Sequence, residues 1–279
     1  MSGRITVIAE AGVNHNGDPA LALKLVDAAA TAGADAVKFQ TFRAEALATA
    51  AAPKAAYQAE VTGADESQLD MLRRLELSPE AHRTAEARCR ARGIRFLSTP
   101  FDLVSLAFLT NDLRVDTVKI GSGDLTNAPL ILAAARTGLP VILSTGMATL
   151  VDVEDALGVL AFGYTAPVDA RPSRAAFAQA FSADAGRAAL KAKVTLLHCT
   201  TEYPAPVEEA NLRAMETMRR AFALPVGLSD HTAGIAVAVA AAALGAVAIE
   251  KHLTLDRTMT GPDHAASLDL RQECVEVLL

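Results

Sequence analysis

The amino-acid sequence predicts an α/β protein built as a (β/α)8 TIM barrel, and three observations support this fold. Short runs rich in β-branched and other apolar residues occur eight times along the 279-residue chain. Segments rich in alanine and leucine, with apolar residues at helical spacing, separate most of these runs. Because strands that alternate with helices form parallel sheets, and because the strands number eight, a closed barrel is favoured over an open doubly wound sheet.

The predicted strands are spaced so that most gaps hold one helix. They cover residues 5–12, 36–42, 95–100, 117–123, 140–146, 194–200, 225–231 and 246–255. The clearest helices between them are predicted at residues 20–32, 78–92, 130–137 and 151–162. The first of these has a start signal in Asp18 followed by Pro19, since aspartate caps a helix and proline is tolerated in its first turn.

Two connections are too long to be simple turns. Residues 44–77 follow the second strand and are expected to cross the barrel mouth before the next helix. Residues 163–193, between the fifth and sixth strands, contain an alanine-rich stretch that predicts a helical insertion rather than a separate domain. We therefore expect residues 1–279 to form a single barrel domain.

Composition and charge exclude several classes of protein. The chain carries 26 Lys and Arg against 32 Asp and Glu, so it has no basic excess with which to bind nucleic acid or a membrane surface. Its sequence shows neither a signal peptide nor an apolar run of the length that spans a membrane. Cys89, Cys199 and Cys274 are widely spaced and form no zinc motif. These features predict a cytoplasmic protein that acts on small molecules.

Strand alternation predicts which side chains face the barrel interior. Where apolar and polar residues alternate, the apolar set is assigned to the helix layer, and the polar set then points inward. The residues predicted to point inward are Glu10, Lys38, Gln40, Thr99, Lys119, Ser144, Ser229, His231, Glu250 and His252. They gather at the carboxyl ends of the strands, where barrel enzymes carry their catalytic residues.

His231 and His252 end two consecutive predicted strands and are expected to form a metal site. Adjacent strands lie about 4.8 Å apart, so the two imidazoles can reach one divalent ion. Two protein nitrogens completed by water and substrate oxygens suit Mn²⁺ or Mg²⁺ better than a closed zinc site. The alternative is that each histidine is a hydrogen-bonded interior residue. The other histidines give weaker signals, and His82 is expected at the surface.

Lysine and hydroxyl side chains at the same end predict a site for anions. The candidate ligands, with the backbone amides of the Gly-Ser-Gly and Ser-Thr-Gly turns, are Lys38, Lys119, Ser122, Ser144 and Ser229. Together they can bind a phosphate and a carboxylate. The structural alternative is an internal salt-bridge network that joins both lysines to Glu10 and Glu250. We favour ligand binding, because so many inward polar groups exceed what a packed apolar core uses.

Eight segments together resemble the sialic acid synthase family. They are IAEAGVNHNGD (8–18), ADAVKFQTF (34–42), FLSTPFD (96–102), VKIGSGDLTNAPL (118–130), ILSTGMA (142–148), LLHCTTEYPAP (196–206), GLSDHT (227–232) and IEKHLTLDRTMTGPDHAASL (249–268). The resemblance runs from the first strand past the eighth. It implies a TIM barrel without the small C-terminal antifreeze-like domain usual in that family.

The resemblance also implies an activity. Members of the family condense phosphoenolpyruvate with an N-acetylated hexosamine, giving a nine-carbon sialic-acid-type 2-keto sugar acid and phosphate. C3 of phosphoenolpyruvate would attack the open-chain sugar aldehyde, water would add at C2, and phosphate would leave by C–O cleavage. The acceptor would be N-acetylmannosamine or a 2,4-diacetamido-trideoxyhexose. The expected cofactor is a divalent metal, Mn²⁺ first and Mg²⁺ or Co²⁺ as alternatives, and the expected assembly is a homodimer.

The family's functional residues match positions of this chain. Its metal ligands match His231 and His252, and its acidic residue beside the attacking water matches Glu10. Its phosphoenolpyruvate contacts match Lys38, Thr99, Lys119, Ser122, Ser144 and Ser229. Positions that line or support its sugar pocket match Gln40, Tyr203, Glu250 and Asp263. Asp124, which we include among the catalytic candidates, stands where the family commonly has Glu, and its shorter side chain is expected to shift a water or a sugar contact.

Two other functions remain open. A Schiff-base aldolase or lyase on the same barrel would use Lys38 or Lys119 as the amine nucleophile. A non-catalytic barrel would bind a sugar phosphate without turnover.

Overall fold

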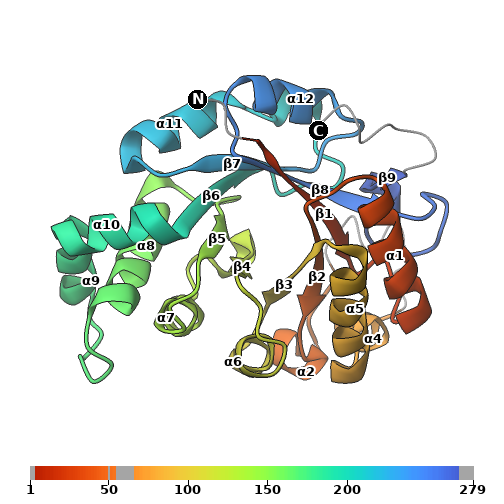
Figure 1. Ribbon diagram of the computed structural model, residues 1–279, viewed down its shortest axis with the longest axis horizontal. Helices are drawn as coiled ribbons and strands as arrows, with labels where there is room; N and C mark the ends of the chain where they lie inside the picture. The colour runs from red at the N-terminus through yellow and green to blue at the C-terminus, as the bar shows by residue number, and fades with distance from the viewer. Residues whose placement is uncertain (1–3, 50, 55–65, 270–279) are drawn as a thin grey trace.

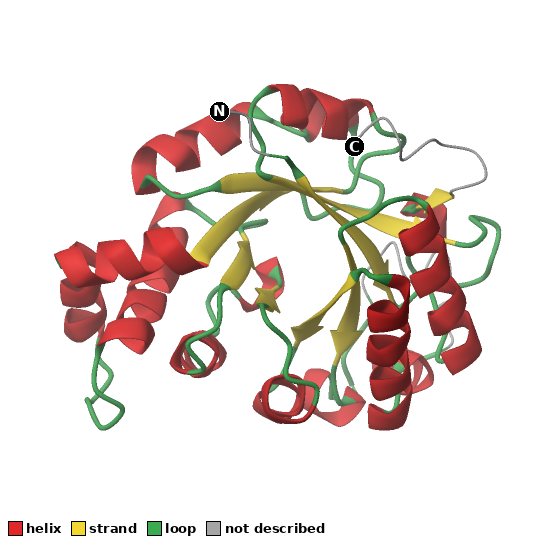
Figure 2. Cartoon of the chain, viewed as in Figure 1, coloured by secondary structure: helices red, strands yellow, loops and turns green. Residues whose placement is uncertain are grey.

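Eight parallel strands stand in a ring with helices around the outside (Figures 1 and 2). The computed structural model describes residues 4–49, 51–54 and 66–269 of the chain. The strands of the ring are β1 (Thr6–Gly12), β2 (Ala36–Thr41), β3 (Arg95–Pro100), β4 (Val118–Ile120), β5 (Val141–Ser144), β6 (Val194–Cys199), β7 (Val226–Asp230) and β8 (Ala248–Thr254). Each overlaps one of the eight predicted strands, which confirms the predicted barrel.

The ring is nearly closed rather than fully closed. Hydrogen-bonded neighbours follow the order β3-β2-β1-β8-β7-β6-β5-β4, so the ladder has its two ends at β3 and β4. These two strands lie side by side in Figure 1. All three residues of β4 pair with β5 before the chain turns into a short 3-10 helix, η2 (Ser122–Asp124). The strand predicted over residues 117–123 is shorter in the structure, because β4 covers only Val118–Ile120. A two-residue strand, β9 (Leu268–Asp269), pairs with β8 outside the ring.

Several helices of the outer layer begin at a residue whose side chain caps them. Their bounds are α1 (Pro19–Thr31), α2 (Ala44–Leu47), α4 (Gln68–Leu75), α5 (Pro79–Arg92), α6 (Leu103–Ala107), α7 (Ala128–Arg136), α8 (Leu150–Thr165), α9 (Arg174–Ser182), α10 (Asp184–Lys193), α11 (Arg213–Phe222) and α12 (Ala236–Ala243), with a π-helical turn η1 (Phe108–Asp112) and 3-10 turns η3 (Val207–Glu209) and η4 (His264–Ala266). Asp18 caps α1 by accepting from the amide of Ala20 over 2.7 Å. Gly93 ends α5 at φ 72°, a left-handed conformation that glycine adopts without strain.

The two long connections hold helices of their own. Between β5 and β6, α8, α9 and α10 pack against one another at one side of the barrel, where the Phe162 and Phe177 rings lie 5.3 Å apart. Two helices, α9 and α10, lie within the predicted insertion at 163–193, and α8 extends into its first residues. After β2, an apolar cluster that includes Val13, Phe42 and Met71 packs α4 against the carboxyl ends of β1 and β2. Residues 55–65 of the predicted excursion lie outside the described residues.

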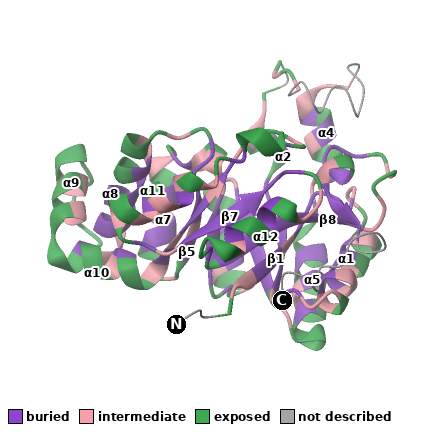
Figure 3. Cartoon of the chain, turned by 90° about the horizontal axis from the view of Figure 1, so that it is seen from above, coloured by how far each residue is buried: buried purple, intermediate pink, exposed green. Residues whose placement is uncertain are grey.

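The interior of the barrel is divided into layers. The large apolar core lies between the strands and the helices, so the strands are buried while the outer helix faces are exposed (Figure 3). A second, small apolar cluster of Ile8, Ala36 and Leu97, with Ile142 packed against it, fills the inside near the amino ends of the strands. The inward residues that lie two or more positions further along these strands are polar. The apolar layer therefore forms the floor of the site described below.

Two further observations bear on the predicted class of protein. In the part of the chain that the structure describes, no helix has both the length and the apolar character needed to cross a bilayer. Cys89 and Cys199 are buried free thiols. Cys274 lies outside the described residues.

Candidate active site

The strand register places polar residues of neighbouring strands opposite one another. Glu10 on β1 pairs with Lys38 on β2 and with His252 on β8. Ser229 on β7 pairs with Glu250 on β8. Residues at paired positions of neighbouring parallel strands point to the same face of the sheet. These side chains therefore all point into the barrel, as the alternation predicts.

Two lysines and two glutamates form one buried ionic cluster in the interior. Lys38 Nζ lies 2.7 Å from Glu10 Oε2 and 3.8 Å from Glu250 Oε2. Lys119 Nζ lies 3.5 Å from Glu250 Oε1, and the Ser229 hydroxyl donates to the same oxygen over 2.8 Å. The salt-bridge network that we weighed as the structural alternative is therefore present. Because its four charges cancel, an anion that enters the site competes with the two carboxylates for the lysines.

The two glutamates hold their charge with different strength. Burial raises the pKa of Glu10 to about 7, while its single close lysine, Lys38, acts to lower it. Burial also acts to raise the pKa of Glu250, but Lys119 and Lys38 together bring it down to about 2. Glu250 is thus the fixed anion between two lysines, and Glu10 is the carboxylate that takes up a proton more readily.

Hydroxyl groups lie next to the lysines on the side of β3, β4 and β5. Lys119 Nζ donates to Ser144 Oγ over 2.8 Å, and Lys38 Nζ donates to Thr99 Oγ1 over 3.3 Å. Gly146 lies next to this group, because a Cβ built on it would stand 3.2 Å from Ser122 Oγ and 2.8 Å from Cys199 Sγ. The structure therefore brings the predicted anion ligands of strands β3, β4 and β5 to one end of the barrel. Lysines, hydroxyls and turn amides in this arrangement suit a phosphate or carboxylate.

His231 and His252 lie together at the mouth of the barrel. Their ring centroids are 5.6 Å apart, and the Tyr203 ring lies 4.2 Å from the His231 ring and 5.4 Å from the His252 ring. His231 and His252 are only 8% and 7% exposed as whole residues. The predicted metal ligands are thus neighbours, and Tyr203, predicted for the sugar pocket, packs against both.

The ring nitrogens of this pair fit a shared divalent ion. His231 Nδ1 lies 2.6 Å from the carbonyl oxygen of Thr200, so it carries the proton and leaves Nε2 as a possible ligand. His252 Nδ1 is buried and has no hydrogen-bond partner among the described residues. Burial lowers the pKa of both imidazoles, so both are neutral, the form that binds metal. The described residues contain no cluster of three or more His, Cys, Asp or Glu ligands, so such an ion would need further oxygens from water or substrate.

Two of the remaining predicted residues lie near this centre. Gly12 has φ +50°, and a Cβ built on it would stand 3.2 Å from Glu10 Oε1, 3.6 Å from Gln40 Nε2 and 3.6 Å from His252 Cε1. Gln40, Glu10 and His252 therefore converge on the space beside Gly12. Asp263 is buried in the segment after β8, where burial raises its pKa to about 6 and Lys38 acts in the opposite direction.

Asp124 is held differently from the other predicted site residues. Its Oδ1 accepts from Asn127 Nδ2 over 3.0 Å within its own turn, and burial raises its pKa. The geometry therefore supports a local capping contact for Asp124, and its catalytic role stays a prediction.

The expectation that His82 lies at the surface was wrong. Its side chain is buried, and its Nε2 lies 3.0 Å from Thr41 Oγ1, which in turn bonds to Ser98 Oγ over 2.7 Å. The polar outward positions of β2 and β3 need a partner in the helix layer, and His82 on α5 supplies it.

The free energy of unfolding is expected to fall as the pH drops below about 6.5, because buried histidines resist protonation. Burial lowers the pKa of His15 to about 3 from its ordinary value of 6.5. Between these values the unfolded chain binds a proton that the folded chain does not, which removes about 1.4 kcal/mol per pH unit. Urea unfolding at pH 7 and pH 5 measures the loss.

His15→Asn is the matched variant for this prediction. His15 Nδ1 accepts from the amide of Gly17 over 2.9 Å, and an asparagine oxygen can accept the same bond. The variant should lose less stability than the unaltered chain between pH 7 and pH 5. Equal losses would contradict the role given to His15.

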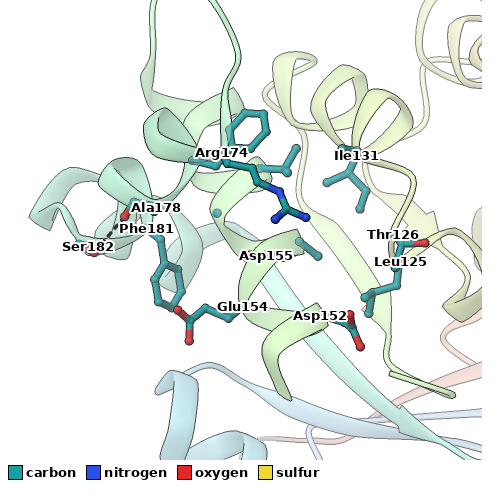
Figure 4. A pocket seen from close by; sticks show the side chains of 15 residues that line it. Leu125, Thr126, Ile131, Asp152, Glu154, Asp155, Arg174, Ala178, Phe181 and Ser182 are labelled. Atoms are coloured by element: carbon teal, nitrogen blue, oxygen red, sulfur yellow. Dashed lines mark hydrogen bonds between the residues drawn. The ribbon is translucent and has the colours of Figure 1, made fainter. Parts of the chain in front are cut away.

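A cavity of about 450 Å³ lies away from the barrel mouth, between α7, α8 and α9. Figure 4 shows Arg174 of α9 extending across it toward Asp155 of α8, with Ile131 of α7 on the opposite wall. None of its lining residues belongs to the predicted site. The cavity therefore reflects how α9 packs on the outer helices.

Comparison with known proteins decides the family. The model of the NeuB family matches residues 25–274. The chain belongs to the NeuB family. The N,N'-diacetyllegionaminic acid synthase of Campylobacter jejuni is 47% identical over 274 residues, which cover 97% of the chain and 75% of that protein. The enzyme of the same name from Legionella pneumophila is 44% identical over 263 residues, covering 94% of the chain and 67% of that protein.

Solved structures agree with this assignment. The N-acetylneuraminic acid synthetase of Leptospira borgpetersenii, solved in complex with citrate, superposes with a TM-score of 0.78 at 32% identity, covering 99% of this chain and 82% of that one. The resemblance to sialic acid synthases stated from the sequence is confirmed. The relatives named here are synthases, and this NeuB-family chain is an enzyme.

Sequence reasoning missed two residues of this NeuB-family site. Asp230 and Lys251 each precede a predicted metal ligand, and both are buried and joined by an ion pair of 2.7 Å. A signal was available in the sequence. Strand alternation assigns both residues to the outward, apolar side of β7 and β8, where two opposite charges on neighbouring strands need one another as partners.

Proposed function

We propose that the chain condenses phosphoenolpyruvate with an N-acetylated amino sugar to give a nine-carbon 2-keto sugar acid and phosphate. One observation carries this proposal. A pair of neutral imidazoles and a pair of lysines lie at the same end of one barrel, in a chain that resembles named sugar-acid synthases over nearly its whole length. The imidazole pair suits the aldehyde end of the sugar, and the lysines suit the enol phosphate.

The lysine end is proposed to bind phosphoenolpyruvate. Lys119 with Ser144, and Lys38 with Thr99, offer donors to the phosphate and the carboxylate. Glu250 stays ionised between the lysines and holds them in place before the substrate enters. The same lysines would stabilise the phosphate dianion when it leaves.

The reaction that follows has three steps. C3 of phosphoenolpyruvate bonds to the aldehyde carbon of the open-chain sugar, and the aldehyde oxygen takes up a proton. Water adds to the oxocarbenium at C2, and Glu10, buried beside Lys38, is positioned to take the proton of that water. The tetrahedral adduct then collapses to the ketone, and its C2–O bond breaks to release phosphate.

His231 and His252 are the residues proposed to hold a divalent metal, Mn²⁺ first and Mg²⁺ or Co²⁺ as alternatives. When bound, such an ion supplies Lewis-acid polarisation of the sugar aldehyde. The chain itself fixes the His231 tautomer through the Thr200 carbonyl and shields both rings from water with Tyr203. These contacts support a metal site at the mouth of the barrel.

The similarity to these relatives favours a 2,4-diacetamido-trideoxyhexose over N-acetylmannosamine as the acceptor of this chain. The two legionaminic acid synthases are 47% and 44% identical to the chain, whereas the N-acetylneuraminic acid synthetase is 32% identical. Phosphate release should be measured with phosphoenolpyruvate, Mn²⁺ and each sugar in turn. We expect turnover with at least one sugar and the higher kcat/KM with the diacetamido sugar. No phosphate release with either sugar would contradict the proposed reaction.

The Schiff-base alternative keeps one point in its favour. Burial lowers the pKa of Lys119, which makes its amine easier to deprotonate. Borohydride treatment in the presence of a 2-oxo acid separates the two reactions. We expect no covalent adduct, because Lys119 is bonded to Ser144 and paired with Glu250. A trapped adduct on this lysine would favour the aldolase.

Two further predictions from the sequence accompany this proposal. We propose that the enzyme forms a homodimer and that it acts in the cytoplasm. Sedimentation measurements on the purified full chain test the first, and fluorescence localisation of the tagged chain tests the second.

A further inference from the structure

A buried ion pair stands directly behind the two imidazoles. Lys251 Nζ donates to Asp230 Oδ2 over 2.7 Å, and the two residues are only 6% and 2% exposed. Asp230 and Lys251 pair across β7 and β8, and each is followed by one of the histidines. They point away from the barrel interior, on the opposite side of the strands from Ser229 and Glu250.

The carboxylate of Asp230 shapes the backbone around His231. Its Oδ1 accepts from the Thr232 amide over 2.9 Å and from the Thr232 hydroxyl over 2.7 Å. An aspartate that accepts from the amide two residues later forms an Asx turn, and the residue at the centre of this turn is His231. The backbone that carries His231 is thus held on one side by its neighbour's side chain, and its carbonyl oxygen accepts from the Ala205 amide over 2.9 Å.

Lys251 ties this turn to the strand that carries His252. Besides Asp230, its ammonium donates to the carbonyl oxygen of Thr232 over 2.7 Å. One lysine on β8 therefore holds the residue before His231 and the residue after it. This matters because β7 ends at Asp230, and the ladder between β7 and β8 has its last pair at Asp230 and Lys251. Beyond that pair, the side chains of Asp230 and Lys251 continue the connection that backbone hydrogen bonds no longer make.

We propose that Lys251 and Asp230 are positioning residues that fix the separation of His231 and His252 and so set the affinity of the site for a divalent ion. This inference rests on the metal site of the proposed function. Neither side chain is a ligand or touches the substrate. The pair acts by holding two imidazoles at one spacing in advance, so that binding an ion does not require the β7–β8 end to become ordered.

The test measures Mn²⁺ binding to the full-length chain, by following the electron paramagnetic resonance signal of free Mn²⁺ during a titration. The variant is the double substitution Asp230→Asn with Lys251→Met. Asparagine keeps the oxygen that accepts from Thr232, methionine keeps the length of the lysine stem, and removing both charges leaves neither one buried alone. The matched control is Asp27→Asn with Arg88→Met, which removes an ion pair of 2.6 Å between α1 and α5 on the outside of the barrel.

We expect the double variant to show a cooperative thermal unfolding transition and to bind Mn²⁺ at least tenfold more weakly than the unaltered chain. The control should bind Mn²⁺ with an affinity within twofold of that of the unaltered chain. A folded double variant with unchanged affinity would overturn the positioning role. If it does not fold, Lys251→Met alone is judged by the same criterion, because it removes both bonds that tie the turn to β8 while Asp230 keeps its bonds to Thr232. An unaltered chain that binds no Mn²⁺ would overturn the metal site itself, which separates failure of the proposed function from failure of this inference.

Discussion

Replacing either His231 or His252 with alanine is expected to lower kcat by at least about a thousandfold while the barrel stays folded. Two imidazoles are the only protein nitrogens proposed for the metal, so removing one leaves a single ligand. A thousandfold loss corresponds to about 4 kcal/mol of transition-state stabilisation, which is the scale of Lewis-acid catalysis. The fold should survive because both rings lie at the mouth, above the apolar floor, and the apolar core does not depend on them.

Phosphate release and thermal melting together check this prediction. His198→Gln is the matched control, since His198 also lies near the end of a strand but its Nε2 donates to the Ala210 carbonyl, outside the imidazole pair. The control should keep activity within a few-fold of the unaltered chain. Turnover of either alanine variant within tenfold of that of the unaltered chain would show that the reaction does not need the imidazole pair. The same conclusion would follow if turnover persisted after Mn²⁺ was removed by chelation.

Lys119→Met is expected to raise KM for phosphoenolpyruvate about a hundredfold, equivalent to about 2.7 kcal/mol of binding free energy. The lysine donates to Ser144 and faces Glu250, so its loss removes a charged donor from the anion site. It should also lower the free energy of unfolding by about 3 kcal/mol, since Glu250 then keeps Lys38 as its one lysine partner. Steady-state kinetics and urea unfolding measure the two effects.

A second substitution separates binding from structure at Lys119. The double variant Lys119→Met with Glu250→Gln removes one charge of each sign and should recover part of the lost stability while KM stays high. Lys193→Met is the control, because Lys193 on α10 donates to the Gly138 carbonyl outside the barrel. A KM that stays within threefold while stability falls would mean that the lysine only completes the salt-bridge network.

Strand alternation predicted the interior of the site well, for a physical reason. Each strand sends every second side chain inward, so a parity assigned from apolar residues also places the polar ones. Glu10, Lys38 and Glu250 therefore meet as expected once the eight strands are in register. The same alternation assigned Asp230 and Lys251 to the outward side of their strands. Two outward charges can be recognised as an ion pair only when their strands are known to be neighbours.

Other features depend on contacts between distant segments that alternation does not encode. His82 lies on α5, a helix that is polar on nearly all sides, and its burial follows from a hydrogen bond to Thr41 across 41 positions of sequence. The gap in the ring between β3 and β4 follows from the early turn after Ile120. The choice between salt bridges and ligand binding for Lys38 and Lys119 was likewise open in the sequence, because both require the same inward charges.

Diffraction from crystals of the chain soaked with Mn²⁺ and phosphoenolpyruvate tests the central claim most directly. Anomalous scattering locates the manganese without any assumption about which residues bind it. The account predicts one manganese peak within about 2.3 Å of a ring nitrogen of both His231 and His252, with the phosphate against Lys38 and Lys119. A manganese bound elsewhere, or a phosphate that leaves both lysines paired only with Glu10 and Glu250, would contradict it.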